Sequence, residues 1–306
     1  MVESILDVID EKSCDAVVLS VPYDYSSSFR KGQDKGPMKI VHCLEEKVEL
    51  FDRFLLLETA KEFSIFHDDS LLSIHSELPE KMIQTVRERW LHHFSSGKFI
   101  ITLGGEHSIS IGVFQGLADF FKESNEISLV QIDAHLDMYD DDSSFNEVNP
   151  GRFSHACVMR RGVELGFPTV QIGIRTYAKS EILFARESKS LIFEWGTGMN
   201  YSVEDIVNAI PTEKVYLTLD IDGLDPAVAP ATGTPVPGGL TWEFCSQFLK
   251  HLFLKKEVVS ADIVEIAPFE DDVRTEYVAA QLCYSMIGYG LCKKRGDFPS
   301  GEKNEE

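Results

Sequence analysis

Two short stretches of the sequence place carboxylates and an imidazole at two-residue spacing at the end of an apolar run. In VQIDAHLDMYD (130–140) the polar residues are Asp133, His135 and Asp137, and in LTLDIDGLD (217–225) they are Asp220 and Asp222. If each strand persists this far, alternate side chains share one face. Carboxylates so close together repel one another unless a cation lies between them. The spacing therefore predicts a metal site, although the acids that continue at 140–142 leave a solvated loop as the alternative.

A third stretch, LGGEHS (103–108), adds His107 at the point where an apolar run gives way to a helical pattern. A histidine there is structural more often than it is a ligand, but it joins four carboxylates and another imidazole. Two divalent ions that share bridging carboxylates explain six such ligands better than one ion does. Oxygen and imidazole donors without thiolate favour Mn²⁺, with Zn²⁺, Fe²⁺ and Co²⁺ as alternatives. A bridging hydroxide on such a pair predicts hydrolysis at an electrophilic carbon or phosphorus.

Other polar residues beside apolar runs have weaker interpretations. Glu265 interrupts VVSADIVEIAP and indicates either a substrate contact or an ion-pair partner, and His155 in FSHACVMRR indicates a proton shuttle or a helix cap. The Pro/Gly-rich segment 223–241 predicts a rigid loop that shapes a pocket. The group at 67–69, His-Asp-Asp, is interpreted as a solvated loop. No role is assigned to His42, His67, His75, His92, His93 and His251.

Apolar, β-branched runs that alternate with helical patterns must position these residues. The expected strands lie in 15–23, 62–67, 98–105, 127–135, 168–175, 190–195, 214–222 and 258–268. Amphipathic helices are expected from residue 109 to 120 and over 79–94, 242–254 and 276–291. The alternation predicts one α/β domain with a parallel sheet and helices on both faces. In such folds ligands bind beyond the carboxyl ends of the strands, where the polar clusters fall.

Composition narrows the possible partners. The chain has 306 residues and a net charge of −21, which disfavours nucleic acid and anionic membranes as partners. The first residues have no basic leader, and no apolar run reaches the roughly 20 residues of a membrane span. Six scattered cysteines predict reduced thiols in a cytoplasmic protein. The last six residues, 301–306, are expected to be a frayed tail.

The segments GGEHS, DAHLD and LDIDGLDPAVAPATGTPVPGGLT together resemble the three metal-binding signatures of the ureohydrolases, the arginase–agmatinase family. PYDYSSSFRKGQDKGP, GIR and VEIAP match the family as well, so the resemblance covers about residues 15–290. It implies a single three-layer αβα domain over 1–300, on a mainly parallel eight-stranded sheet. It also implies two manganese ions per subunit, release of urea from a small cationic guanidine, and a homo-oligomer, a trimer or hexamer.

The resemblance also implies a role for each site residue. One manganese would be bound by His107, Asp133, Asp137 and Asp220, and the other by Asp133, His135, Asp220 and Asp222. Glu265 matches the glutamate that binds the guanidinium, and Thr234 matches a threonine beside it. His155 matches the histidine that shuttles protons, and Asp137 would accept a proton from the bridging hydroxide.

The substrate is predicted from two departures. Arginases contact the carboxylate and the amino group of arginine with an asparagine and an aspartate, where this chain has Tyr139 and Ala178. The resemblance therefore favours agmatine, cleaved to urea and putrescine, with Tyr139 lining the substrate site. N1-aminopropylagmatine, guanidinobutyrate, formiminoglutamate and arginine remain alternatives, and arginines at 152, 160 and 161 keep anionic substrates open. A catalytically inactive binding subunit and a zinc deacetylase of similar fold are the rivals from other classes.

Overall fold

A computed structural model describes residues 5–6, 10–144, 148, 150–196, 198–199 and 201–299, so the expected tail lies outside the described residues. Its centre is an eight-stranded sheet in the order β4-β1-β5-β10-β9-β6-β7-β8, in which every neighbouring pair is parallel. The strands are β1 (Ala16–Val21), β4 (Ile65–Asp68), β5 (Phe99–Gly104), β6 (Ile127–Ile132), β7 (Thr169–Ile174), β8 (Leu191–Glu194), β9 (Lys214–Asp220) and β10 (Glu257–Val264). Short strands β2 (Phe51–Asp52) and β3 (Leu57–Glu58) form a separate antiparallel pair.

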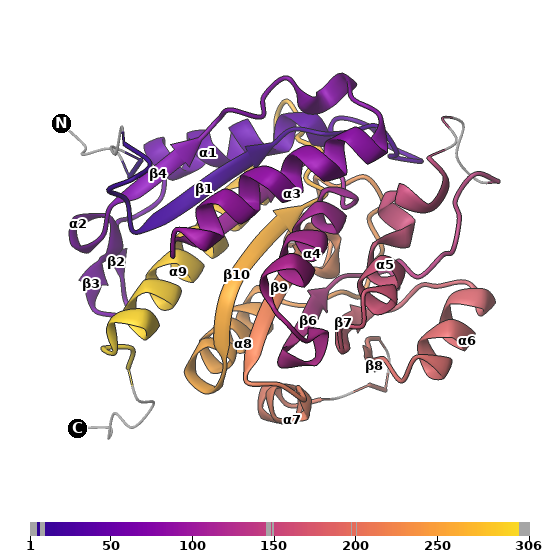
Figure 1. The fold of residues 1–306 in the computed structure, drawn as a ribbon. Helices are drawn as coiled ribbons and strands as arrows, with labels where there is room; N and C mark the ends of the chain where they lie inside the picture. Colours follow the sequence, from indigo (N-terminus) through magenta and orange to yellow (C-terminus); the bar gives the residue numbers. More distant parts are fainter. Residues whose placement is uncertain are drawn as a thin grey trace.

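Helices cover both faces of this sheet (Figure 1). One face carries α1 (Gly36–Glu46), α7 (Val203–Ala209), α8 (Trp242–Lys255) and α9 (Arg274–Arg295). The other carries α3 (Pro79–Ser95), α4 (Ile109–Phe120), α5 (Val158–Glu164) and α6 (Lys179–Glu187). The remaining short helix is α2 (Thr59–Glu62), which follows β3. The single three-layer αβα domain is confirmed, and its two apolar cores lie on opposite sides of the sheet.

The buried runs of the sequence explain why the central strands form. Strands β1, β5, β6 and β7 are buried at every position, as expected for parallel strands covered by helices on both faces. All eight expected runs contain a strand, and the four expected helices are α3, α4, α8 and α9. The expectation that the 127–135 strand carries the ligands is wrong, because β6 ends at Ile132.

One acidic group was misread from the sequence. Asp68 is 2% exposed, belongs to β4 and forms an ion pair with Arg89, so it does not lie in a solvated loop, whereas Asp69 beyond the strand is exposed. The side chains of His93 and Asp68 are buried against each other at 2.7 Å. These contacts join β4 to α3.

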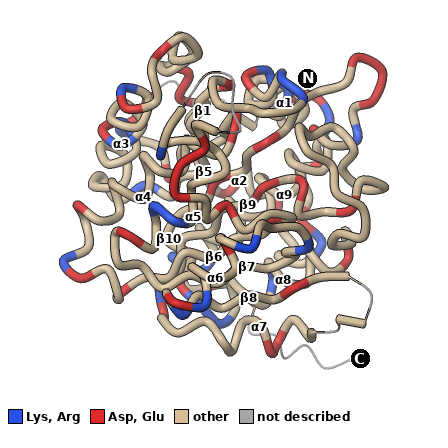
Figure 2. Tube along the Cα trace, turned by 90° about the vertical axis from the view of Figure 1, so that its right-hand side faces the viewer, with Lys and Arg blue, Asp and Glu red and all other residues tan. Residues whose placement is uncertain are grey.

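The six cysteines are buried and unpaired, as expected for reduced thiols. Among the described residues no helix has the length and apolar character needed to cross a membrane. Figure 2 shows acidic and basic positions spread along the described part of the chain.

Candidate metal centre

Four adjacent central strands, β5, β10, β9 and β6, deliver polar side chains from their carboxyl ends to one place. His107 follows β5, Glu265 follows β10, and Asp220 is the last residue of β9. The remaining ligand candidates lie in the segment after β6 and in the 3-10 turn Ile221–Gly223 after β9. Parallel strands end at the same edge of a sheet, so residues far apart in sequence meet there.

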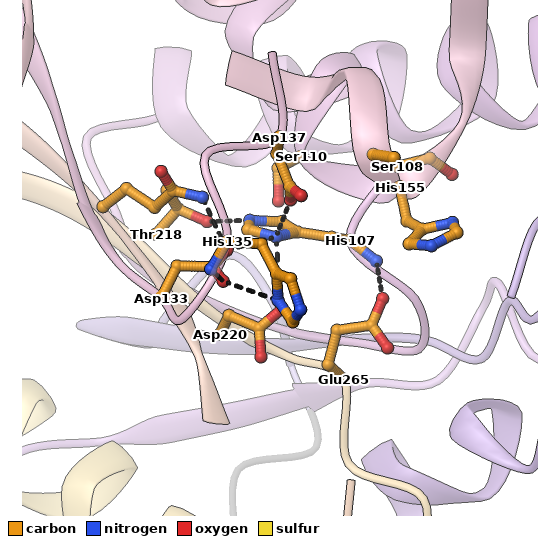
Figure 3. Close-up of polar contacts among 12 residues, drawn as sticks. His107, Ser108, Ser110, Asp133, His135, Asp137, His155, Thr218, Asp220 and Glu265 are labelled. Atoms are coloured by element: carbon orange, nitrogen blue, oxygen red, sulfur yellow. Dashed lines mark hydrogen bonds and ion pairs between the residues drawn. The ribbon is translucent and has the colours of Figure 1, made fainter. Parts of the chain in front are cut away.

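The six candidate ligands predicted from the sequence converge, and all of them except Asp222 are labelled in Figure 3. His107 Nδ1 lies 3.1 Å from Asp137 Oδ2, 3.3 Å from Asp133 Oδ2 and 3.4 Å from Asp220 Oδ2. His135 Nδ1 lies 3.1 Å from Asp222 Oδ2 and 3.4 Å from Asp133 Oδ1. Two overlapping groups result, and Asp133 belongs to both.

These residues fit two divalent cations. His107 Nδ1 is buried, has no hydrogen-bond partner among the described residues, and points at three carboxylate oxygens. Such an orphaned nitrogen among acceptors is the arrangement expected of an imidazole ligand. The donor set of carboxylate oxygens and imidazole nitrogens suits Mn²⁺ among other divalent ions. The structure therefore supports a centre for divalent metal ions.

The electrostatics of the cluster also call for positive charge. Burial, followed by the charge of Asp133, raises the pKa of Asp137 to about 7. Burial and the neighbouring charges of Asp222 and Asp133 raise the pKa of Asp220 well above its usual value. Although burial opposes the imidazolium, Asp222 and Asp133 raise the pKa of His135 to about 12. Metal ions at this place would keep the carboxylates ionised.

Backbone contacts, rather than a continuous strand, hold the ligands after β6. Asp133 Oδ1 accepts the His135 N–H at 2.7 Å, and Asp133 Oδ2 accepts from the Gln131 side chain at 2.6 Å. Asp222 Oδ1 accepts the Ala134 N–H at 3.1 Å, which ties the β6 and β9 segments together. The prediction of convergence was right, and its assumed strand geometry was wrong.

A buried polar network beneath His107 escaped the sequence analysis. His107 Nε2 lies 2.8 Å from Thr218 Oγ1, which donates to Asp262 Oδ1 at 2.7 Å. Tyr216 and Ser110 both donate their hydroxyls to Asp262 Oδ2, at 2.6 and 2.7 Å. The hydroxyl of Thr218 therefore accepts from Nε2–H and leaves Nδ1 as the free ligand atom. Asp262 sits inside an apolar run, and its only sequence signal was that interruption.

Glu265 is held in a defined orientation on the same side of the cluster as His155 (Figure 3). Its Oε1 accepts the His107 N–H at 2.8 Å, and its Oε2 accepts from Gln33 Nε2 at 3.1 Å. Burial and the nearby charge of Glu106 raise the pKa of Glu265 to about 8, and a cationic partner would favour its charged form. Gln33 was missed because it is 232 residues away in the sequence.

A cavity of about 470 Å³ opens onto the cluster. Its lining includes Tyr139, His155, Thr234 and Glu265, which the sequence placed at the substrate. Thr234 donates to Asp222 Oδ2 at 3.0 Å, so its observed contact is with a ligand candidate. Burial lowers the pKa of His155 below its usual range.

The three arginines that kept anionic substrates open lie elsewhere. Arg152, Arg160 and Arg161 form ion pairs with Asp140 and Glu164. Among the described residues none of the three lines the cavity. The carboxylates of Asp142 and Glu181 do line it, so the lining is anionic.

An open parallel sheet thus carries a buried carboxylate–imidazole centre that can hold metal ions at its carboxyl edge. The arginase-family model matches residues 14–288, and the chain belongs to this family of ureohydrolases. The family membership inferred from the sequence motifs is thereby confirmed.

Relatives and solved structures agree with this assignment. The chain is 34% identical over 279 residues to an N(1)-aminopropylagmatine ureohydrolase of Synechocystis, covering 89% of this chain and 88% of the relative. It is 30% identical over 290 residues to an agmatinase of Pyrococcus horikoshii, covering 92% and 94%. The solved agmatine ureohydrolase of Thermoplasma volcanium matches with a TM-score of 0.79 and 29% identity, over 96% of this chain and 97% of that one.

Proposed function

We propose that this enzyme hydrolyses the guanidinium group of agmatine, a linear cationic guanidine, to urea and putrescine. One observation carries the proposal. The buried Glu265 carboxylate and members of both candidate ligand groups line the same anionic cavity. Agmatine carries a positive charge at each end and no carboxylate. The cavity offers acidic side chains and no arginine among its described lining residues.

The six ligand candidates, His107, Asp133, His135, Asp137, Asp220 and Asp222, would hold two manganese ions. When bound, the ions would supply an activated, water-derived nucleophile at neutral pH and would keep the surrounding carboxylates ionised. Glu265 would bind the guanidinium through charge-assisted hydrogen bonds and direct its carbon toward the cluster. Gln33 and the His107 N–H fix the orientation of that carboxylate.

In this proposal, Asp137 and His155 transfer the two protons of the water to the departing amine. Water adds to the guanidinium carbon, and the bond to the alkyl nitrogen then breaks with its electron pair on nitrogen. Both protons of the water end on the departing amine, one by way of the carboxylate of Asp137 and one by way of His155 Nε2. The water oxygen becomes the carbonyl oxygen of urea. Thr234 and Tyr139, which line the cavity, would contact the substrate.

N1-aminopropylagmatine is the second candidate, because relatives that bear that name are 33–34% identical to this chain. It presents the same guanidinium to Glu265 and differs only at its far end. The proposal extends to a homo-oligomer in the cytoplasm, with polyamine precursors as substrates. The proposal also assigns residues 1–300 to the ureohydrolase domain.

The test is urea release by protein stripped of metal and reloaded with Mn²⁺, with agmatine, N1-aminopropylagmatine and arginine as substrates. We expect turnover of a cationic guanidine only after reloading. Glu265→Gln should lower kcat/KM by about 100-fold, since it removes a buried charged partner. The matched control is Glu270→Gln, an exposed glutamate five residues on, which should change nothing. A faster reaction with arginine, or a reloaded protein inert to every guanidine, would refute the proposal.

A further inference from the structure

The hydroxyl of Ser154 has three polar neighbours around His155. It donates to Asp142 Oδ2 at 2.7 Å and accepts the Ala156 N–H at 3.2 Å. Its third contact is His155 Nδ1, also at 3.2 Å. Ser154 is fully buried and Asp142 is 4% exposed, so this arrangement is sheltered from solvent.

Counting protons and lone pairs fixes the direction of the third bond. A serine hydroxyl has one proton and two lone pairs. A carboxylate only accepts, and the short contact to Asp142 takes the Ser154 proton. The Ala156 N–H occupies one lone pair, so the second faces His155 Nδ1. That nitrogen can complete the bond only by carrying hydrogen and donating it.

A second serine contacts the same residue and helps to hold the ring in place. Ser26 Oγ accepts the backbone N–H of His155 at 3.0 Å and lies 3.3 Å from Nδ1. The Ser26 backbone N–H is itself bound to the buried carboxylate of Glu106 at 3.3 Å. The ring is therefore held from two directions, by the loop before α1 and by the segment before α5.

The other nitrogen of the ring faces the substrate cavity. His155 Nε2 lies 3.3 Å from Ser28 Oγ, and both residues line the cavity. With hydrogen on Nδ1, the neutral ring presents an acceptor at Nε2. Burial lowers the pKa of His155, which favours this neutral ring before substrate enters.

We propose that Asp142 and Ser154 are positioning residues that hold His155 in its Nδ1–H form, so that Nε2 alone exchanges protons with the cavity. The inference rests on the proposed function, in which Nε2 delivers a proton to the departing nitrogen. During that step Nε2 first gains a proton and then loses it to the amine, while Nδ1–H keeps its bond to Ser154. The arrangement Asp142–Ser154–His155 is similar to the carboxylate–imidazole pair of a catalytic triad, with a serine hydroxyl between the two groups.

Two other interpretations of Asp142 make different predictions. If Ser154 is only a cap of the short helix His155–Cys157, its loss should affect stability and leave the tautomer of His155 unchanged. If Asp142 binds the far ammonium of the substrate instead, its loss should raise KM and leave kcat unchanged. A positioning role lowers kcat, leaves KM nearly constant, and changes the tautomer.

The experiment compares the full chain with Ser154→Ala and Asp142→Asn. Asp142→Asn leaves Ser154 in place as the cap of the short helix His155–Cys157. This variant therefore still tests the proposal if Ser154→Ala folds poorly. Ser143→Ala, an exposed serine of the same loop, is the matched control. Steady-state urea release from agmatine gives kcat and KM of the manganese-loaded proteins. Long-range ¹H–¹⁵N correlation spectra of the metal-free proteins give the tautomer of His155 without any need for activity.

We expect kcat to fall about 10–100-fold in both variants with KM within about twofold, as for a misplaced general acid. With a fluorinated agmatine, whose departing amine is less basic, the fall in kcat of the two variants should be smaller. The parent spectrum should show Nδ1–H, and both variants should lose that preference. An Nε2–H ring in the parent, an unchanged kcat in both variants, or a rise in KM alone would overturn the inference. A parent that is inactive but shows Nδ1–H would refute the proposed function and leave this geometry supported.

Discussion

Removing the hydroxyl of Thr218 should weaken metal binding at a distance from the metal. Thr218 contributes no ligand atom, but its Oγ1 links His107 Nε2 to Asp262 Oδ1 at 2.8 and 2.7 Å. Thr218→Val keeps the shape of the side chain on β9 and deletes only this link. The imidazole then loses the partner that fixes its orientation and its tautomer.

The size of the effect follows from the polar atoms that Thr218→Val leaves without a hydrogen-bond partner. His107 Nε2–H and one oxygen of Asp262 both lose a partner where neither reaches solvent. Each such loss costs about 1–3 kcal/mol, and Asp262 keeps its bonds from Tyr216 and Ser110. The free energy of unfolding of the metal-free protein should fall by about 3 kcal/mol. The affinity for Mn²⁺ should fall about 10–100-fold.

Chelator competition measures the manganese affinity, and urea denaturation of metal-free protein measures the stability. Thr218→Ser restores the hydroxyl and should return both quantities to near the parent values. The matched control is Thr102→Val on β5, because the Thr102 hydroxyl is buried and has no partner among the described residues. That replacement should be neutral or stabilising. If Thr218→Val bound manganese as tightly as the parent, the supporting role of this network would be wrong.

Three further perturbations test other parts of the molecule. Gln33→Ala removes the 3.1 Å donor to Glu265 and should lower kcat/KM by about tenfold, measured as urea release, with Mn²⁺ affinity unchanged. Gly105→Ala would place a Cβ 1.9 Å from the carbonyl oxygen of Tyr23 and should cost about 3 kcal/mol in urea denaturation. Although burial opposes it, bonds to histidine and arginine hold the pKa of Asp68 below its usual range. Stability from Asp68 is therefore fully present above pH ~4 and declines gradually on acidification, so Asp68→Asn should destabilise by about 3 kcal/mol at pH 7 and by a smaller but still measurable amount at pH 3, where the folded-state carboxyl remains ionised.

The strands and the convergence of the candidate ligands could be predicted because their signals are local. A parallel strand buried on both faces must be apolar almost throughout, so β5, β6 and β9 stand out from their surroundings. The acidic residues at the ends of β6 and β9 then contrast sharply with the runs before them. Since parallel strands end at one edge, placing the strands also placed the ligands together.

The supporting contacts could not be predicted because they join distant segments. Gln33 meets Glu265 across 232 residues, and Thr218 meets Asp262 across 44. A glutamine in a loop and an aspartate in a strand have many possible partners, and only the packed fold selects one. Asp68 was misread for the same reason, since Arg89 and His93 approach it from another element.

Backbone strain at the centre shows that contacts within the fold hold two of the carboxylate residues. Asp137 and Glu265 have φ values of 52° and 67°, a left-handed conformation that costs roughly 1–2 kcal/mol for a residue with a side chain. Long-range backbone bonds hold both. The Asp137 carbonyl accepts from the N–H groups of Met159 and Arg160 at 3.0 and 3.3 Å, and the Glu265 N–H donates to the Gly105 carbonyl at 2.8 Å. Because these bonds come from the protein alone, the carboxylates are aimed by the fold. Metal removal should therefore abolish turnover and leave these two backbone conformations in place.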